Sequence, residues 1–435
     1  MEGAQSLEDA VTSDLEGRFA ALWASLLPIG LAGTGEGYVR YAWTTADLDC
    51  REWFTEEALD RDLDVEVDGN GNIWATWLPD GVDAGSVDAG SVDPSSVDPS
   101  SVDPRRAAIV TGSHLDSVPH GGAFDGPLGV VSALLAIDEL RARGAAIRKP
   151  IRIAVFTEEE GSRFGVACLG SRLLTGAITA EKALALTDRD GVTLADAMTR
   201  AGMETSAVGP DPDRVAGIEA FIELHIEQGR AMETPVGIAS AIWPHGRWRI
   251  DFHGEGNHAG TTRMDDRHDP MLTFAYTVLA ANKEARLSGA HATVGRVEAT
   301  PNATNAIPSS VTAWLDARAA DEPTLAKVVE AIGAKATDRA GRDGTSVRVS
   351  AESASAETIF EETLGNRLSA VLPAADILPT GAGHDAGVLA GHVPTAMLFV
   401  RNPTGVSHAP SEYAAPADCA AGVRALADVL QELAC

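Results

Sequence analysis

Basic residues are scarce in this 435-residue sequence. Lys and Arg number 34 against 63 Asp and Glu, which gives a formal net charge of −29 at pH 7. Nucleic acids and anionic membranes bind basic surfaces, so this charge excludes both as expected partners. No apolar run reaches the roughly 18 residues of a membrane span. The acidic N-terminus "MEGAQSLEDAVTSDLEGRF" also lacks the basic and apolar regions of a signal peptide.

Cysteine is also rare. The four cysteines, at positions 50, 168, 419 and 435, lie far apart and fit neither a disulfide framework nor a CxxC metal site. We therefore expect a cytoplasmic protein. The sequence has no GxSxG nucleophile elbow, no P-loop and no GxGxxG between a strand and a helix. Serine-nucleophile and dinucleotide chemistry are thereby disfavoured, and the cysteines lack the neighbouring histidine that thiol catalysis needs.

Two apolar runs that end in polar residues are present, and a helical pattern separates them. "RAAIVTGSHLD" and "KPIRIAVFTEEE" read as buried strands, and "GPLGVVSALLAIDELRARG" between them has apolar residues at helical spacing. Strand, helix and strand in this order predict an α/β fold with a parallel sheet. Chemistry gathers at the carboxyl ends of such strands, where "SHLD" and "TEEE" both lie.

The length favours two domains. Residues 241–354 show a strand, helix, strand, helix, strand pattern that predicts a small α+β domain. It interrupts a sheet domain formed by 1–240 and 355–435. Residues 82–104 repeat a five-residue unit rich in Gly, Pro and Ser. We expect a flexible loop there, since the copies are too few for the alternative, a repeat fold.

Imidazole and carboxylate side chains recur at the predicted strand ends, without cysteine. They are His114 and Asp116, Asp125, the three glutamates 158–160, His225 and His408. Such a set suits zinc, manganese, cobalt or nickel in a hydrolytic site. A single histidine of this kind is more often a structural residue, so the prediction rests on the whole set.

Seven ordered blocks carry a family resemblance: "GSHLDSVPHGGAFDGPLGV", "TEEEGSRFG", "ELHIEQG", "GEGNHAGTTRMDDRHD", "PNATNAIPSSVTAWLDAR", "GAGHDA" and "GVSHAPSEY". They resemble the signature blocks of the hydantoinase/carbamoylase family of binuclear-metal amidohydrolases. Its members include N-carbamoyl-L-amino-acid hydrolases, β-ureidopropionases and allantoate amidohydrolases. The resemblance runs from about residue 20 to the C-terminus. It implies a metallopeptidase-like mixed sheet with helices on both faces, interrupted by a lid and dimerisation domain.

The resemblance also implies roles at the metal site. His114, Asp125 and His225 would bind one divalent metal, and Asp125 would bridge to a second held by Glu160 and His408. Two ions per subunit are implied, zinc or manganese first, with cobalt or nickel as alternatives. A shared carboxylate offsets the repulsion of two neighbouring cations.

The residues beside the ligands would orient them and move the proton. Asp116 would accept the other N–H of His114 and fix its tautomer. Glu159 would act as general base toward a metal-bridging water, and Glu158 would be a structural hydrogen-bond partner.

Substrate binding would fall to Gln228, His258, Asn305 and Arg318. A guanidinium binds a carboxylate through two parallel hydrogen bonds, so Arg318 implies a carboxylated substrate. The alternative is a surface pair between Arg318 and Asp316. His258 would reach the active site from the partner subunit of a homodimer and polarise the scissile carbonyl. Its alternative is a turn histidine that caps a strand.

The expected function is hydrolysis of a linear C–N bond in a small carboxylated ureido or N-carbamoyl compound, such as allantoate or an N-carbamoyl-L-amino acid. An N-acyl-amino-acid hydrolase or dipeptidase is the alternative within this chemistry, although those relatives tend to carry an acidic residue where this chain has His225. A catalytically dead binding protein is the alternative outside it. His384 and Asp385 in "GAGHDAG" match a family block but receive no role.

Overall fold

The computed structural model describes residues 2–33, 36–79 and 108–435, and the chain divides into two units. Unit 1 comprises Met1–Ser240, Phe360–Leu378 and Gly383–Cys435, and unit 2 comprises Ala241–Ile359 and Pro379–Ala382. The short segment of unit 2 is bound to the long one by hydrogen bonds. The carbonyl of Thr380 accepts from the backbone N–H of Trp243 at 2.8 Å. The expected repeat loop, 82–104, lies outside the described residues.

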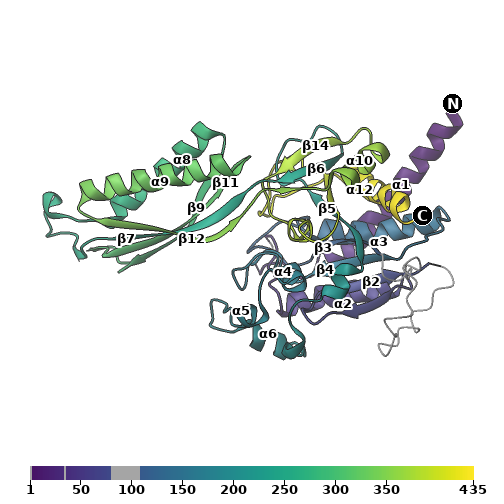
Figure 1. Ribbon diagram of the computed structural model, residues 1–435, viewed down its shortest axis with the longest axis horizontal. Helices are drawn as coiled ribbons and strands as arrows, with labels where there is room; N and C mark the ends of the chain where they lie inside the picture. Colours follow the sequence, from purple (N-terminus) through teal and green to yellow (C-terminus); the bar gives the residue numbers. More distant parts are fainter. Residues whose placement is uncertain (1, 34–35, 80–107) are drawn as a thin grey trace, which may run out of the picture. The chain divides into compact units, whose positions relative to one another are not determined.

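The two predicted apolar strands lie side by side in a sheet with nine described strands, in the order β1-β2-β4-β3-β5-β15-β6-β13, with β14 paired to β6 (Figure 1). Neighbours among β4, β3, β5 and β15 are parallel, whereas β1, β2, β6 and β13 pair antiparallel. This mixed sheet confirms the predicted α/β class. The strands are β1 Asp64–Val67, β2 Ile73–Trp77, β3 Ala108–His114, β4 Ile151–Phe156, β5 Ile218–Ile226, β6 Val236–Ile242, β13 Thr358–Ile359, β14 Asp376–Thr380 and β15 Thr395–Val400.

Helices of unit 1 cover this sheet. They are α1 Glu2–Leu26, α2 Thr45–Leu59, α3 Pro127–Ala142, α4 Leu169–Thr175, α5 Ala180–Leu184, α6 Leu194–Arg200, α7 Pro212–Ala216, α10 Glu362–Val371, α11 Asp385–Leu389 and α12 Pro416–Ala434, with a 3₁₀ turn at Thr205–Ala207. No helix among these residues, or elsewhere in the described chain, is long and apolar enough to cross a membrane.

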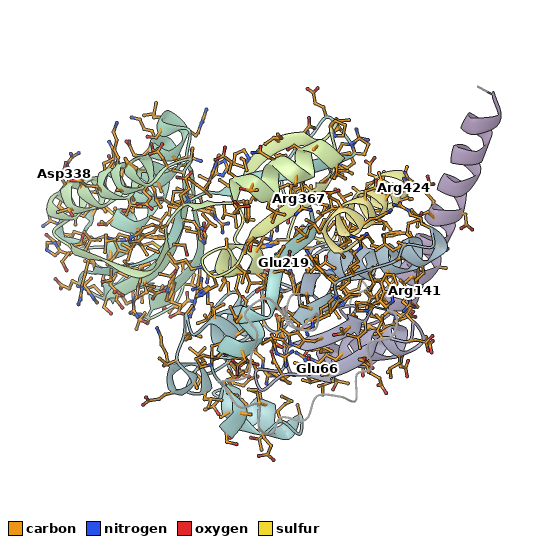
Figure 2. All side chains as sticks on the ribbon, turned by 45° about the vertical axis from the view of Figure 1, so that its right-hand side comes forward. Glu66, Arg141, Glu219, Asp338, Arg367 and Arg424 are labelled. Atoms are coloured by element: carbon orange, nitrogen blue, oxygen red, sulfur yellow. The ribbon has the colours of Figure 1, made fainter. Side chains whose placement is uncertain are left out.

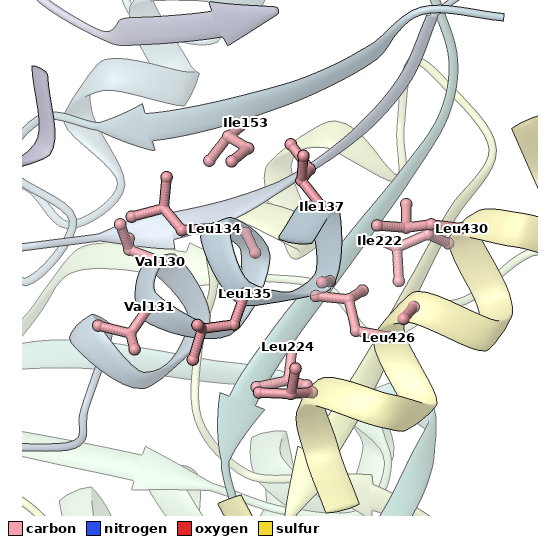
Figure 3. Close-up of a cluster of buried hydrophobic side chains, with 14 of the residues drawn as sticks. Val130, Val131, Leu134, Leu135, Ile137, Ile153, Ile222, Leu224, Leu426 and Leu430 are labelled. Atoms are coloured by element: carbon pink, nitrogen blue, oxygen red, sulfur yellow. The ribbon is translucent and has the colours of Figure 1, made fainter. Parts of the chain in front are cut away.

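One apolar core lies between the sheet and the pair α3 and α12. Leu134 and Ile137 of α3, Leu224 of β5 and Leu426 of α12 are all fully buried in it (Figure 3). Burial of such side chains contributes on the order of 1.5–3 kcal/mol each. This core fixes the sheet beneath the polar strand ends.

The opposite sheet face is more polar. Side chains alternate along a strand, so Glu223 points away from the face that carries Leu224. Its Oε2 accepts the backbone N–H of Ala386, in α11, at 2.9 Å. Helices α3 and α11 therefore lie on opposite faces of the sheet, as the metallopeptidase-like prediction requires.

Unit 2 has a four-stranded antiparallel sheet in the order β12-β7-β11-β9 and two long helices. In β11 every second residue is buried, which matches a sheet with one face against helices. The sequence pattern did not predict β9, whose residues alternate poorly and are mostly exposed. The elements are β7 His245–His253, β8 Asn257–His258, a 3₁₀ turn at Met264–Asp266, α8 Pro270–Ser288, β9 His291–Thr300, β10 Ala306–Ile307, β11 Ser310–Arg318, α9 Glu322–Asp343 and β12 Ser346–Ser355.

Charged side chains cover both units (Figure 2). Some form surface ion pairs, such as Glu66 with Arg214 at 2.6 Å and Arg367 with Glu432 at 3.0 Å. Exposed pairs of this kind contribute about 0–1 kcal/mol each. They keep an acidic surface solvated and do not define the fold.

Candidate metal centre and active site

The predicted ligands meet at one edge of the unit 1 sheet. His114 is the last residue of β3, Glu160 follows β4, and His225 is the penultimate residue of β5. His408 follows β15, and Asp125 lies just before α3. Because β4, β3, β5 and β15 are parallel neighbours, their carboxyl ends bring these side chains together.

A first group consists of His114, Asp125 and His225, all buried. Asp125 Oδ1 lies 3.5 Å from His114 Nε2 and 3.2 Å from His225 Nε2. One nitrogen or oxygen from each residue lies within 4.8 Å of the others, which is close enough to share one ion. The donors are two imidazoles and one carboxylate, a set that catalytic zinc and related ions accept.

A second group consists of Asp125, Glu160 and His408. His408 Nε2 lies 3.3 Å from Asp125 Oδ2 and 3.6 Å from Glu160 Oε2. The two oxygens of Asp125 therefore face different groups. This is the arrangement expected of a carboxylate that bridges two cations.

Hydrogen bonds hold both buried imidazoles with Nε2 toward Asp125. His225 Nδ1 lies 2.9 Å from the carbonyl of Ile226, and His114 Nδ1 lies 3.1 Å from the backbone carbonyl of Asp116. A proton on each Nδ1 leaves Nε2 with the lone pair that binds a cation, although His225 Nε2 accepts the backbone N–H of Gly126 at 3.2 Å. His114 Nε2 is buried and has no hydrogen-bond partner among the described atoms. The histidines thus fit a metal ion.

The charges of the site fit a cation as well. Burial and the charge of Asp125 raise the pKa of Glu160 to about 7. Burial would lower the pKa of His408, but its hydrogen bond to Asp125 and the charge of Glu160 raise that pKa to about 9. Several carboxylates thus lie close together in one buried site. Bound divalent cations would reduce the electrostatic repulsion between them.

The turn "TEEE" is fixed by Asp116. Asp116 Oδ1 accepts the backbone N–H of Glu159 and Oδ2 that of Glu160, each at 3.1 Å. The same carboxylate lies 3.5 Å from His114 Nδ1, slightly farther than the backbone carbonyl that binds this nitrogen. Asp116 therefore orients both His114 and the glutamate turn.

Each glutamate of the turn has a different environment. Glu159 Oε2 lies 3.5 Å from His114 Nε2, and burial raises the pKa of Glu159 well above its ordinary value, against the opposing charge of His114. Glu158 is fully buried with φ of 53°, and its Oε1 accepts the backbone N–H groups of Arg163 and Phe164 at 2.9 and 2.7 Å. Burial raises the pKa of Glu158 to about 8. It is a structural acceptor, as the sequence indicated.

Two residues that the sequence interpretation missed, Glu412 and Gly126, determine the position and surroundings of Asp125. Glu412 is buried, and its Oε1 accepts the backbone N–H groups of Phe124 and Asp125, both at 2.9 Å. Gly126 has φ of 84°, and a Cβ there would overlap the ring of His114. Glu412 stands in "SHAPSE", four residues after His408, so its place in the same block was the available signal.

Further polar groups lie behind the ligands. Glu223 Oε1 accepts from the Ser113 hydroxyl at 2.9 Å, and Asp385 Oδ1 accepts from the Ser171 hydroxyl at 2.5 Å. The ring of His384 lies 4.5 Å from that of His225, centre to centre. The block "GAGHDAG" thus packs directly against His225, a candidate metal ligand.

Gln228 contacts Asp125, the carboxylate that is predicted to bridge the two metal ions. Its Nε2 donates to Asp125 Oδ2 at 2.6 Å and to the Ser407 hydroxyl at 3.3 Å, and that hydroxyl also donates to Asp125 Oδ2 at 3.2 Å. The Gln228 Oε1 atom is buried and makes no hydrogen bond among the described residues. Its substrate role stays a prediction.

The three other predicted substrate residues lie in unit 2, whereas all five metal-ligand candidates lie in unit 1. Position 258 in β8 pairs with Ala306 of β10, next to Asn305, which is exposed. His258 Nδ1 accepts the backbone N–H groups of Gly260 and Thr261 at 3.0 and 3.2 Å, so it does cap a turn.

Arg318 is paired within unit 2. Its Nε donates to Asp316 Oδ1 at 2.8 Å, and its Nη1 donates to the carbonyl of Gly381 at 2.6 Å. The surface pair considered from the sequence is therefore present, and the substrate role of Arg318 stays a prediction.

Comparisons with known proteins identify the family of the chain. Residues 110–432 match the model of peptidase family M20/M25/M40. The chain is 31% identical over 427 residues to an N-carbamoyl-L-amino acid amidohydrolase of Geobacillus stearothermophilus, covering 95% of this chain and 98% of that protein. It is 34% identical over 344 residues to an allantoate amidohydrolase of Bacillus subtilis, covering 75% and 81%.

A solved structure supports the same assignment. A hydantoinase/carbamoylase family amidase of Burkholderia vietnamiensis superposes with a TM-score of 0.82 at 30% identity, covering 96% of this chain and 97% of that one. The sequence resemblance is thereby confirmed: the chain belongs to peptidase family M20/M25/M40 and, within it, to the hydantoinase/carbamoylase amidohydrolases.

Proposed function

We propose that this chain hydrolyses a linear C–N bond of a small carboxylated ureido or N-carbamoyl compound, such as allantoate or an N-carbamoyl-L-amino acid. It is a metal-dependent hydrolase of carbon–nitrogen bonds other than peptide bonds. The observation that carries the proposal is the pair of ligand groups that share Asp125, with Glu159 beside them. The names of the two curated relatives support the ureido substrate class.

The metal ions, when bound, activate water and polarise the scissile carbonyl. His114, Asp125 and His225 would hold one ion, and Asp125, Glu160 and His408 the other, zinc or manganese first and cobalt or nickel as alternatives. Glu159 accepts a proton from the attacking water and delivers it to the leaving nitrogen. Burial raises the pKa of Glu159, which makes its carboxylate a stronger proton acceptor than an exposed one.

Arg318 is proposed to bind the substrate carboxylate. Its guanidinium already forms a two-atom contact with Asp316, Nε to Oδ1 at 2.8 Å and Nη2 to Oδ2 at 3.1 Å. A substrate carboxylate has the same shape, so it can replace Asp316 on the same two donors. Asn305 and the unpartnered Oε1 of Gln228 are proposed to bind the ureido group.

We propose that the chain forms a homodimer through unit 2, because two features of the surface of this unit are typical of interfaces. Strand β9 is an edge strand with mostly exposed residues, and an exposed long edge favours pairing with a second copy. Helix α8 exposes Leu272, Leu279 and Leu287 by 46%, 70% and 72%. Apolar patches of this kind mark interfaces. In such a dimer His258 would serve the partner's active site.

We also propose a cytoplasmic location. The four cysteines are free and widely spaced, as is usual for proteins of a reducing compartment.

One experiment tests the proposed function. The protein is dialysed against a chelator, its metal content is measured, and it is reconstituted with Zn²⁺, Mn²⁺, Co²⁺ or Ni²⁺. Each form is assayed on allantoate, N-carbamoyl amino acids, N-acyl amino acids and dipeptides. We expect turnover of a ureido or N-carbamoyl substrate only with metal. Undiminished turnover in protein shown to be metal-free contradicts the metal-dependent reading, and turnover confined to dipeptides or N-acyl compounds contradicts the substrate class.

A further inference from the structure

Cys168 is a buried residue next to the proposed general base, and the mechanism above does not use it. It is 4% exposed and precedes α4. Its Sγ lies 3.3 Å from Glu159 Oε1, within hydrogen-bond range for a thiol donor. Burial and the charge of Glu159 raise the pKa of Cys168 well above its ordinary value, so the thiol keeps its proton.

The two oxygens of Glu159 have different surroundings. Oε1 accepts from the Cys168 thiol, while Oε2 lies 3.5 Å from His114 Nε2 and so faces the metal ligands. A carboxylate rotates about its last bond unless both ends are held. A donor on Oε1 therefore selects the orientation in which Oε2 points at the site.

The backbone places the thiol where it can do this. The N–H groups of Cys168, Leu169 and Gly170 donate to the carbonyls of Glu159, Glu158 and Thr157 at 2.6, 3.1 and 2.9 Å. These three bonds join the segment before α4 to the first three residues of the turn, Thr157 to Glu159. Cys168 itself has φ of 54° and ψ of 39°, a left-handed conformation that a non-glycine residue adopts only where its surroundings fix it.

The backbone of Cys168 has a further contact with the side chain of Ser171. The Ser171 hydroxyl donates to Asp385 Oδ1 at 2.5 Å, and its oxygen lies 3.1 Å from the backbone carbonyl of Cys168. The block "GAGHDAG", through Asp385, thus reaches the general base by way of Ser171 and Cys168. The buried Asp385 is therefore part of the network of contacts that includes Ser171, Cys168 and Glu159.

We propose that Cys168 is a positioning residue for the reaction: its S–H group donates to Glu159 Oε1 and holds Oε2 toward the attacking water. The proposal rests on the proposed function, because it assigns Glu159 the role of general base. It requires no covalent or redox step of the thiol. A thiol is a weak hydrogen-bond donor. The S–H group of Cys168 therefore orients the Glu159 carboxylate but interferes little with the proton that this carboxylate accepts.

The test compares Cys168→Ala, which removes the donor, with Cys168→Ser, which keeps an O–H donor. On whichever substrate the wild-type protein turns over, we expect Cys168→Ala to lower kcat about tenfold, while KM and metal content stay near the wild-type values. We expect Cys168→Ser to retain most of kcat. Cys50→Ala is the matched control, since Cys50 is an equally buried cysteine in α2, and its kcat should equal that of the wild type.

A double-mutant cycle separates positioning from a general packing effect. In the Glu159→Gln background, Cys168→Ala should cause no further loss of kcat, because the group it orients is no longer a base. Equal kcat for wild type and Cys168→Ala overturns the proposal. So does a tenfold loss that persists in the Glu159→Gln background, or a loss shared by Cys168→Ser. If wild-type protein with metal turns over no ureido substrate, the proposed function fails instead.

Discussion

Asp116 and Glu159 are joined by a hydrogen bond from the backbone N–H of Glu159 to Asp116 Oδ1, at 3.1 Å. The other oxygen of Asp116 binds the next N–H along the chain, that of Glu160. One buried carboxylate thus sets the backbone of both the proposed general base and a proposed metal ligand.

Asp116→Asn should lower both stability and turnover. An amide presents one oxygen, so one of the two N–H groups would face an NH₂ group and lose its partner. The expected cost is about 1–3 kcal/mol in the free energy of unfolding, measured from urea unfolding midpoints, together with a fall in kcat. Asp376→Asn is the control: Asp376 Oδ2 alone accepts the backbone N–H groups of Glu233 and Thr234, so the amide oxygen can replace it and kcat should not change. Unchanged kcat in Asp116→Asn would show that the turn does not depend on this carboxylate.

The three consecutive glutamates should respond differently to the same substitution. Glu159→Gln should lower kcat on the order of 10²–10⁴-fold with full metal content, since it removes the proton acceptor only. Glu160→Gln should lower the bound metal, measured by elemental analysis. Glu158→Gln is the control: its oxygen can still accept from Arg163 and Phe164, so activity should stay within a few-fold of wild type. Metal loss in Glu159→Gln would mean that the roles of Glu159 and Glu160 are exchanged.

Thiol labelling should distinguish Cys435 from the other three cysteines. Burial raises the pKa of Cys50 to about 11 and that of Cys419 to about 12, and both side chains are inaccessible. Iodoacetamide reacts with the thiolate, so at pH 8 we expect alkylation first at the partly exposed Cys435, and at all four sites in urea. Peptide mass spectrometry measures the sites. Rapid labelling of Cys168 in the folded protein would contradict the buried place assigned to it.

The sequence predicted the sheet from local patterns, whereas the two ligand groups were expected from the family resemblance. His114 and Glu160 stand directly after apolar runs, and parallel strands must bring such ends together. The strand "HATVGRVEAT" was missed because a β-bulge interrupts its apolar alternation, which runs through Ala292 and Val294 and resumes out of phase at Val297 and Ala299.

The contacts around the general base could not be predicted in the same way. Glu412 reaches Asp125 across 287 positions of the chain, and the bond from Cys168 to Glu159 depends on the left-handed turn before α4. The block that contains His408 marks Glu412 as a residue near the site, but no residue pattern marks its contact with Asp125 or the contact of Cys168 with Glu159.

The final prediction is that each active site is shared between two subunits. It rests on the distribution of the candidate residues: the metal ligands lie in unit 1, and His258 and Arg318 lie in unit 2. His258 Nδ1 is used by a turn, but no hydrogen bond to its Nε2 is described, so this atom remains able to polarise a carbonyl. We expect His258→Ala to bind metal normally and to turn over substrate poorly.

Complementation tests whether His258 acts in the partner's site. Inactive His258→Ala is mixed with inactive Glu159→Gln under conditions that allow subunit exchange. If His258 acts across the dimer, each mixed dimer has one site with both Glu159 and His258 intact. Random pairing makes half of all dimers mixed, so recovery should approach roughly a quarter of wild-type activity. If His258 serves its own subunit, every site lacks one group and no activity returns. Absence of recovery, with exchange demonstrated by differently tagged subunits, would therefore place His258 in its own subunit's site and remove the argument for a shared one.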